Sequence, residues 1–170
     1  MYKTNNMALN AYLSLKGTKS GDIKGSVTQK GREGKIMVIA ANHHITSPRD
    51  LSSGLPTNRR QHKPLVITKE VDKSSPILYN VLCTNETLSE VTLEFWQASL
   101  RSSGPGAGVE TKYYTIKLTN AHIVDISLNM LNNKNPDLVR YAEYEEIAFV
   151  YEKIEWTFVT GGITSSDTVI

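Results

Sequence analysis

The chain has 170 residues, a formal net charge of +2 and an apolar share of 39%. This length favours one domain with its own hydrophobic core, and the small charge gives no sign of a nucleic-acid or anionic-membrane partner. Cys83 is the only cysteine, which excludes an intrachain disulfide and a zinc site made of thiolates. A lone thiol also fits a reducing compartment.

The start of the chain carries no export or membrane signal. The polar residues 1–7 precede an alternating segment, residues 8–15, which is too interrupted for a signal-peptide core. No apolar run approaches the roughly 18 residues of a membrane span. We therefore expect a protein that folds in the cytoplasm without membrane insertion and that needs no cleaved signal for export. Residues 1–6 are expected to be a flexible N-terminal extension.

Strand patterns dominate the first half of the chain. Residues 9–15 alternate apolar and polar side chains, which predicts a strand with one buried face. A loop rich in Gly and Lys is expected over 16–34. The continuous apolar run 36–41 suits a strand that is covered on both faces, and another strand is predicted over 65–71.

One helix is predicted after this strand. Ser74 or Ser75 can cap its start, and Pro76 fits the first turn because its missing N–H costs nothing there. Apolar residues at helical spacing form its expected buried stripe, which consists of Ile77, Leu78, Val81 and Leu82. Since Cys83 lies next to this stripe, we expect a buried structural cysteine rather than a nucleophile paired with a histidine.

The second half of the chain again shows strand patterns. Strands are predicted over 90–98, 112–119 and 124–130, with a glycine-rich turn at 104–108 between the first two.

The last predicted strand, residues 144–160, changes phase along its length. Its apolar residues occupy odd positions as far as Tyr151 and even positions from Ile154 onward. A strand cannot exchange its faces without an irregularity, because its side-chain period is two. A bulge or sharp bend is therefore predicted near Glu152–Lys153.

Seven or so strands with one short helix predict a mainly β fold. The expected architecture is a β-barrel of two tightly packed sheets with the helix on its side. We assign residues 7–163 to this single domain and residues 164–170 to a flexible C-terminal tail.

No catalytic, cofactor or metal site is predicted. His43 and His44 are adjacent, so on a strand they point to opposite faces and cannot readily chelate one metal. The glutamates between Glu143 and Glu155 could serve acid–base chemistry only if they converge across strands. An exposed strand face explains them equally well.

The one concentration of charge is the basic loop 46–62. Loops longer than about 12–15 residues are usually functional or disordered. Two interpretations remain open: a solvated surface loop, or an arm that docks on an acidic surface of a neighbouring subunit. The carboxylates of residues 143–155 are candidate acceptors. The predicted interface residues of this arm are Pro48, Arg49, Leu55, Arg59, Arg60 and His62.

Long segments of the chain resemble one protein family. The run HKPLVITKEVDKSSP, from His62 to Pro76, closely resembles the signature of the Hcp proteins, the haemolysin-coregulated proteins of the bacterial type VI secretion system. Further segments match in register: VTLEF at 91–95, YYTIKLTNAHI at 113–123 and EEIAFVYEKIEW at 145–156. The resemblance covers nearly all of residues 7–163.

The resemblance implies a fold, an assembly and a role. Hcp-like chains form a β-barrel of two sheets with one helix at the side; six copies close into a ring, and rings stack into the inner tube of a contractile machine. The implied partners are the VgrG spike protein, the contractile sheath and small effector proteins in the ring lumen. The tube is secreted when the machine fires, and no enzymatic activity and no cofactor are implied.

The residues alone leave an alternative function open. A barrel could hold a small ligand inside itself, although a barrel with this number of strands is usually filled by its own side chains.

Overall fold

The computed structural model describes residues 9–98 and 109–169. Its strands, in chain order, are β1 (Ala11–Gly17), β2 (Gly21–Ile23), β3 (Ile36–Val38), β4 (Ala40–Asn42), β5 (Ile45–Thr46), β6 (Gln61–His62), β7 (Leu65–Glu70), β8 (Leu88–Ala98), β9 (Glu110–Asn129), β10 (Tyr144–Phe158) and β11 (Ile163–Thr168). The one helix of these residues is α1 (Ser75–Cys83). The predicted extension 1–6 and the predicted turn 104–108 lie outside the described residues.

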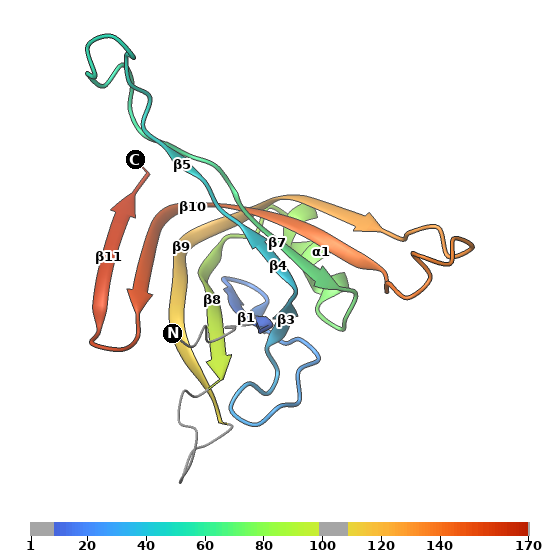
Figure 1. Cartoon of the computed structure of the whole chain (residues 1–170). Helices are drawn as coiled ribbons and strands as arrows, with labels where there is room; N and C mark the ends of the chain where they lie inside the picture. Colours follow the sequence, from blue (N-terminus) through green and yellow to red (C-terminus); the bar gives the residue numbers. More distant parts are fainter. Residues whose placement is uncertain (1–8, 99–108, 170) are drawn as a thin grey trace, which may run out of the picture.

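The strands close into a barrel. Hydrogen bonds join β1, β8, β9, β10, β7 and β4 in that order, and β3 pairs with β1. Because only Ile39 separates β3 from β4, the segment 36–42 leaves β1 and joins β7, which closes the circuit (Figure 1). The predicted mainly β barrel with one short helix is confirmed.

The closing segment differs from its prediction in one respect. Continuous apolar character predicted a strand covered on both faces, yet all of β4 is exposed and Ile39 is 47% exposed. One face of this segment is therefore uncovered in the single chain.

The longest strands, β9 and β10, turn a corner together (Figure 1). The strands predicted over 112–119 and 124–130 are one continuous strand, β9. Its bend contains Asn120, whose φ of 49° lies in the left-handed region. The side-chain amide of Asn120 donates a 2.8 Å hydrogen bond from Nδ2 to Oε2 of Glu152 on β10.

The predicted change of phase in β10 is confirmed, because Tyr151 and Ile154 are both buried. The change falls between these two residues, near the predicted position, where the pairing with β9 skips Glu152 and Asn120. A second irregularity, the register shift between Ala148 and Phe149, was not predicted.

The C-terminal segment is a strand and not the predicted tail. Strand β11 pairs antiparallel with β10, from Ile163 opposite Phe158 to Thr168 opposite Lys153. The sequence did not predict this strand, because its small, polar residues show no alternation of apolar and polar side chains. The glycines of the connecting turn, Gly161 and Gly162, both have positive φ, which allows the tight reversal.

The barrel interior is filled by its own side chains. Large side chains without exposed surface come from strands all around the barrel: Leu13, Ile36, Leu65, Ile67, Leu93, Leu118, Ile147, Phe149 and Ile154. This filled core argues against a small ligand held inside the barrel.

Helix α1 covers one side of the barrel with Leu78 and Val81, which are buried. Ile77 is 38% exposed, so the predicted stripe is narrower than expected, and Cys83 is exposed, contrary to the prediction. Ser74 occupies the N-cap position as predicted, although its side chain makes no capping bond.

A buried ionic cluster lies beneath the start of α1. The Lys69 side chain has no exposed surface, and its Nζ contacts Oε2 of Glu145 at 2.9 Å, Oδ1 of Asp72 at 3.0 Å and Oγ of Ser75 at 3.0 Å. These partners compensate the buried charge, which would otherwise be costly. The cluster joins β7, β10 and the helix start.

Candidate assembly surface

The basic loop predicted over 46–62 is an ordered hairpin arm. Strands β5 and β6 pair antiparallel and continue the paths of β4 and β7 beyond the barrel (Figure 1). Farther out, Arg49 and Pro56 form a bridge, and the amide of Thr57 donates a 3.0 Å bond to the carbonyl of Pro48. The arm therefore has a backbone structure of its own.

The arm tip is a turn organised by Asp50. Its Oδ1 accepts bonds from the amides of Ser52 at 2.7 Å and Ser53 at 2.8 Å, and from the Ser52 hydroxyl. The Ser52 hydroxyl and these amides lower the pKa of Asp50 to about 2. At this turn Leu51 is fully exposed and Leu55 is 65% exposed. The turn thus presents two apolar side chains to solvent.

The base of the arm is bonded to the C-terminal strand. Arg60 forms a bidentate ion pair with Asp167 of β11, and its Nη2 also donates to the carbonyl of Thr168 at 2.8 Å. Nε2 of His62 lies 2.8 Å from Oδ2 of Asp167. The bond from Arg60 is the largest cause that lowers the pKa of Asp167 to about 2, and the bond to His62 acts in the same direction.

Two histidines meet at one phenol behind this ion pair. Nδ1 of His62 lies 2.9 Å from the Tyr151 hydroxyl, and Nε2 of His43 lies 2.6 Å from it. Burial, and secondarily the charge of Asp167, raises the pKa of Tyr151 to about 12. Tyr151 therefore keeps its proton and can donate to one imidazole while accepting from the other. Burial is also the main cause that lowers the pKa of His43.

Two residues of the predicted interface have partners within their own chain. Arg60 and His62, which we predict to reach a neighbouring subunit, are both bonded to Asp167. Asp167 is the only acidic residue of the segment assigned to a tail, and an arm–tail pairing could have been suspected from that alone.

The other four predicted residues remain on the arm surface. Leu55 and Arg59 are exposed, Pro48 is part of the bridged hairpin, and Nη1 of Arg49 donates to the Gly54 carbonyl. Sequence reasoning missed Leu51, whose signal was an apolar residue in a polar loop.

The predicted acidic acceptors do not form one surface. Glu145 is buried against Lys69, Glu152 is bonded to Asn120, and Glu155 lies 3.9 Å from Lys153. Glu146 is exposed.

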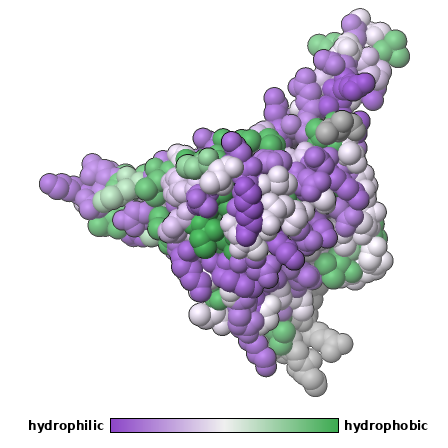
Figure 2. Space-filling model, turned by 180° about the vertical axis from the view of Figure 1, so that it is seen from behind, coloured by the Kyte–Doolittle hydropathy of each residue, from purple (hydrophilic) through white to green (hydrophobic). Residues whose placement is uncertain are grey.

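Apolar side chains lie on the surface of the single chain as well as inside it. Figure 2 shows them among polar residues on the barrel face and on both projections. The exposed set includes Ile39, Leu51, Leu55, Val124, Leu128, Met130, Val139 and Tyr141. Such residues spread over several elements are typical of surfaces that other copies or partners cover.

The part of the chain that the structure describes contains neither a candidate metal-binding cluster nor a candidate membrane-spanning helix. Within residues 9–98 and 109–169, no group of three or more His, Cys, Asp or Glu residues could hold a metal ion. No helix of these same residues has the length and apolar character needed to cross a membrane.

Comparison with known proteins matches this architecture to one family. The family described as "Type VI secretion system effector, Hcp" matches residues 12–158. The chain belongs to the Hcp family. A relative named "Major exported protein", from Pseudomonas aeruginosa, is 39% identical over 170 residues, which cover 95% of each chain.

Solved Hcp structures share the fold. Hcp1 from the E. coli EAEC 042 pathovar is 35% identical, with a TM-score of 0.81 and coverage of 95% of this chain and 99% of that one. The secreted protein Hcp3 from Pseudomonas aeruginosa is 33% identical, with a TM-score of 0.72 and coverage of 94% and 97%. The Hcp family comprises structural, secreted tube proteins of type VI secretion and is not an enzyme family.

Proposed function

We propose that six copies of this Hcp-family chain close into a ring and that the rings stack into the inner tube of a type VI secretion system. The observation that carries the proposal is the arm: an ordered hairpin, bonded at its base within the chain, with a fully exposed Leu51 at its tip. An exposed leucine on a fixed projection has no role in the single chain, and a neighbouring copy can cover it.

The form of the molecule supports a ring. A cyclic assembly of six copies uses a heterologous interface, so each protomer needs two different surfaces that complement each other. The exposed Ile39 and β4 lie on the barrel wall, whereas Leu128, Met130 and Tyr141 lie on the projecting end of the β9–β10 pair. These are two separate apolar regions on one chain.

The further partners follow from membership of the family. We propose that VgrG caps the tube, that a contractile sheath surrounds it and that small effector proteins occupy the ring lumen. We also propose that the chain folds in the cytoplasm and leaves through the type VI machine without a cleaved signal. The single exposed Cys83 fits folding in a reducing compartment.

Sedimentation velocity tests the ring. The proposal predicts a main species of about six times the 18.9 kDa chain mass. A species of single-chain mass at every concentration would contradict it.

A further inference from the structure

Four polar side chains from four parts of the chain form one hydrogen-bonded cluster. His43 follows β4, and His62, Tyr151 and Asp167 belong to β6, β10 and β11. The Tyr151 hydroxyl lies 2.6 Å from Nε2 of His43 and 2.9 Å from Nδ1 of His62. Nε2 of His62 in turn lies 2.8 Å from Oδ2 of Asp167. The cluster therefore attaches the base of the arm to the barrel wall and to the C-terminal strand.

The carboxylate of Asp167 fixes the direction of every hydrogen bond in this cluster. Its pKa of about 2 keeps it ionised, and a carboxylate can only accept, so Nε2 of His62 donates to it. A neutral His62 then accepts at Nδ1 from the Tyr151 hydroxyl, which leaves the phenol oxygen to accept from Nε2 of His43. Each contact thus has one donor and one acceptor while both imidazoles are neutral.

The cluster can take up one proton without losing a bond. A proton added to Nδ1 of His43 leaves Nε2 of the same ring free to donate to the phenol. A proton added to Nδ1 of His62 reverses the chain: His62 then donates to Tyr151, and Tyr151 donates to His43, whose own proton moves to Nδ1. The bonding pattern therefore tolerates one charged imidazole.

A second proton has no such arrangement. Both imidazolium rings would direct an N–H group at the phenol oxygen, and the proton of Tyr151 would lose its acceptor within the cluster. Two positive charges would also face each other across one oxygen atom. Of the other charged groups at the cluster, Asp167 is already paired with Arg60, and the imidazole of His44 adds to the repulsion. The doubly charged form therefore favours separation.

The pKa of His43 gives the direction of this effect. Burial is the main cause that lowers the pKa of His43 below its ordinary value of 6.5, and the charges of His62 and His44 act in the same direction. The closed cluster therefore binds this proton less tightly than a state in which His43 faces solvent. The stability that His43 contributes is complete above about pH 6.5 and is lost as the pH falls through the lowered pKa.

We propose that this cluster is a protonation-controlled latch, which holds the base of the arm against β10 while no more than one of its imidazoles is charged and releases it when both are charged. The protons come from solvent and return to it, so the step needs no other reactant. All the contacts lie within one chain, so the inference does not depend on the proposed ring.

Hydroxyl-radical footprinting of the full chain tests the latch. Tyr151 is 8% exposed and the His62 side chain 3% exposed, so oxidation of these two residues, measured by mass spectrometry, reports opening. Between about pH 7.5 and about pH 5, their oxidation should rise by up to about tenfold per pH unit, because the open state binds one more proton. Asp167 stays ionised throughout this range, since its pKa is about 2.

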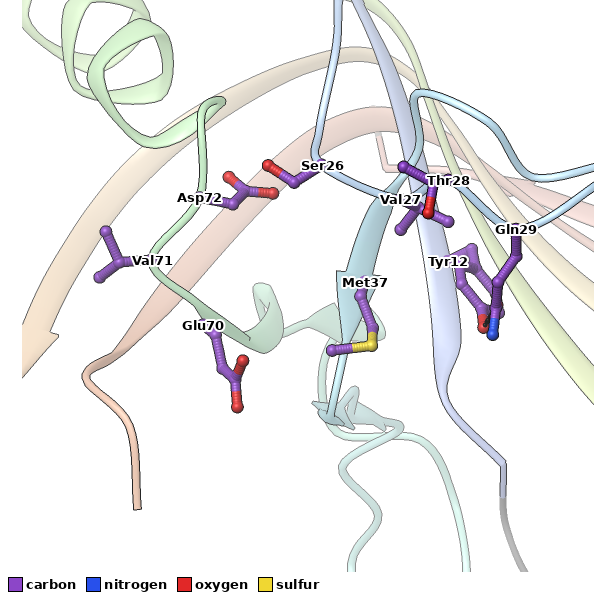
Figure 3. Close-up of a pocket in the computed structure, with 9 residues that line it drawn as sticks. All are labelled: Tyr12, Ser26, Val27, Thr28, Gln29, Met37, Glu70, Val71 and Asp72. Carbon is purple, nitrogen blue, oxygen red and sulfur yellow. Dashed lines mark hydrogen bonds between the residues drawn. The ribbon is translucent and has the colours of Figure 1, made fainter. Parts of the chain in front are cut away.

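Tyr12 is the internal control. This residue of β1 is 3% exposed, and it lies beside Gln29 and Met37 in a groove outside the cluster (Figure 3). Its hydroxyl donates to Oε1 of Gln29 at 2.6 Å and accepts from Arg32 at 3.1 Å. Neither partner changes its protonation near neutral pH, so the oxidation of Tyr12 should stay constant across the range.

A pair of variants identifies the group that binds the proton. In His43→Gln, the amide nitrogen can still donate to Tyr151 but the side chain cannot be protonated, so the rise in oxidation should disappear. His122→Gln is the matched control, because Nε2 of His122 lies 2.9 Å from the Thr87 hydroxyl and takes no part in the cluster. This variant should keep the full rise of the wild type.

Three results would overturn the latch. The first is constant oxidation of Tyr151 in the wild type across the whole pH range. The second is an equal rise in His43→Gln and His122→Gln, which would remove His43 from the mechanism. The third is a parallel rise at Tyr12, which would show a general loosening of the barrel in place of a local release.

Discussion

Asp167 lies 2.8 Å from His62, and this contact joins the C-terminal strand to the base of the arm. Asp167 also accepts the bidentate bonds of Arg60, so one carboxylate on β11 holds two residues of the arm. Replacing Asp167 with Asn removes the charge that pairs with Arg60. We expect amide hydrogen exchange to become several-fold faster in both β11 and the arm base. Local unfolding of either segment then no longer has to break this ion pair, so its free-energy cost is lower. Ser166→Ala, on the same strand, is the control; equal exchange in both variants would contradict the role of Asp167.

The same contact should weaken in acid. The pKa of Asp167 is lowered to about 2 from an ordinary value of 3.8, so the folded state holds the proton less tightly than the unfolded state. The stability that this group contributes is therefore complete above about pH 4 and is lost as the pH falls toward 2. Wild-type β11 should show faster exchange across this window, and Asp167→Asn should show a smaller change. An identical pH profile for the two proteins would rule out Asp167 as the titrating group.

Lys69 is expected to be critical for the stability of the barrel. In Lys69→Met, the carboxylate of Glu145 stays only 2% exposed and loses its cationic partner, which should cost about 3–5 kcal/mol of unfolding free energy. Lys69→Met/Glu145→Gln removes both charges and should recover part of this loss. Urea unfolding at one fixed protein concentration measures both variants, and a neutral effect of Lys69→Met would be incompatible with the ionic cluster described above.

Gly25 and Gly31 lie in the same loop but should tolerate alanine differently. A Cβ at Gly25 would overlap the backbone of Lys35 and Ile36, which cannot move aside as a flexible side chain would. Gly25→Ala should therefore cost about 1–3 kcal/mol or more. A Cβ at Gly31 meets open space, and only its positive φ opposes the substitution, at a cost of about 1–2 kcal/mol. Thermal unfolding gives the comparison; an equal loss at both positions would show that the close approach at Gly25 has no energetic consequence.

The sequence predicted the barrel because its buried strands follow a period of two. Leu65, Ile67 and Leu93 each fall on the buried face that alternation assigns to them. It could not predict β11, whose pairing depends on hydrogen bonds to β10 and on one carboxylate rather than on apolar residues. The irregularity at Asn120 was missed although the apolar pattern carries it, because the buried residues of β9 change from the even positions of Ile116 and Leu118 to the odd positions of Ala121 and Ile123.

The candidate site was predicted in outline only. A long basic loop indicated an arm, and Leu55 is exposed as an interface residue should be. Arg60 and His62 bond to Asp167, which lies more than a hundred residues away in sequence. No local sequence pattern connects these residues, so the bonds could not be predicted. The exposed thiol of Cys83 also departs from expectation, because the helix buries a narrower stripe than its sequence suggests.

Removing the arm tip should separate folding from assembly. A deletion of residues 50–55, closed by a short glycine linker, spares the pairing of β5 with β6 and the bonds of Arg60 and His62. We expect a folded protomer with near wild-type thermal stability that assembles poorly. Leu51→Asp should act in the same direction with a smaller change to the chain. Normal rings and tubes from the deletion variant would exclude the arm as an assembly element.

Negative-stain electron microscopy of the purified chain tests the central claim most directly. Class averages should show rings of six-fold symmetry with a central opening, alone or stacked end to end. Particles that remain single chains at high protein concentration would contradict the proposed tube subunit.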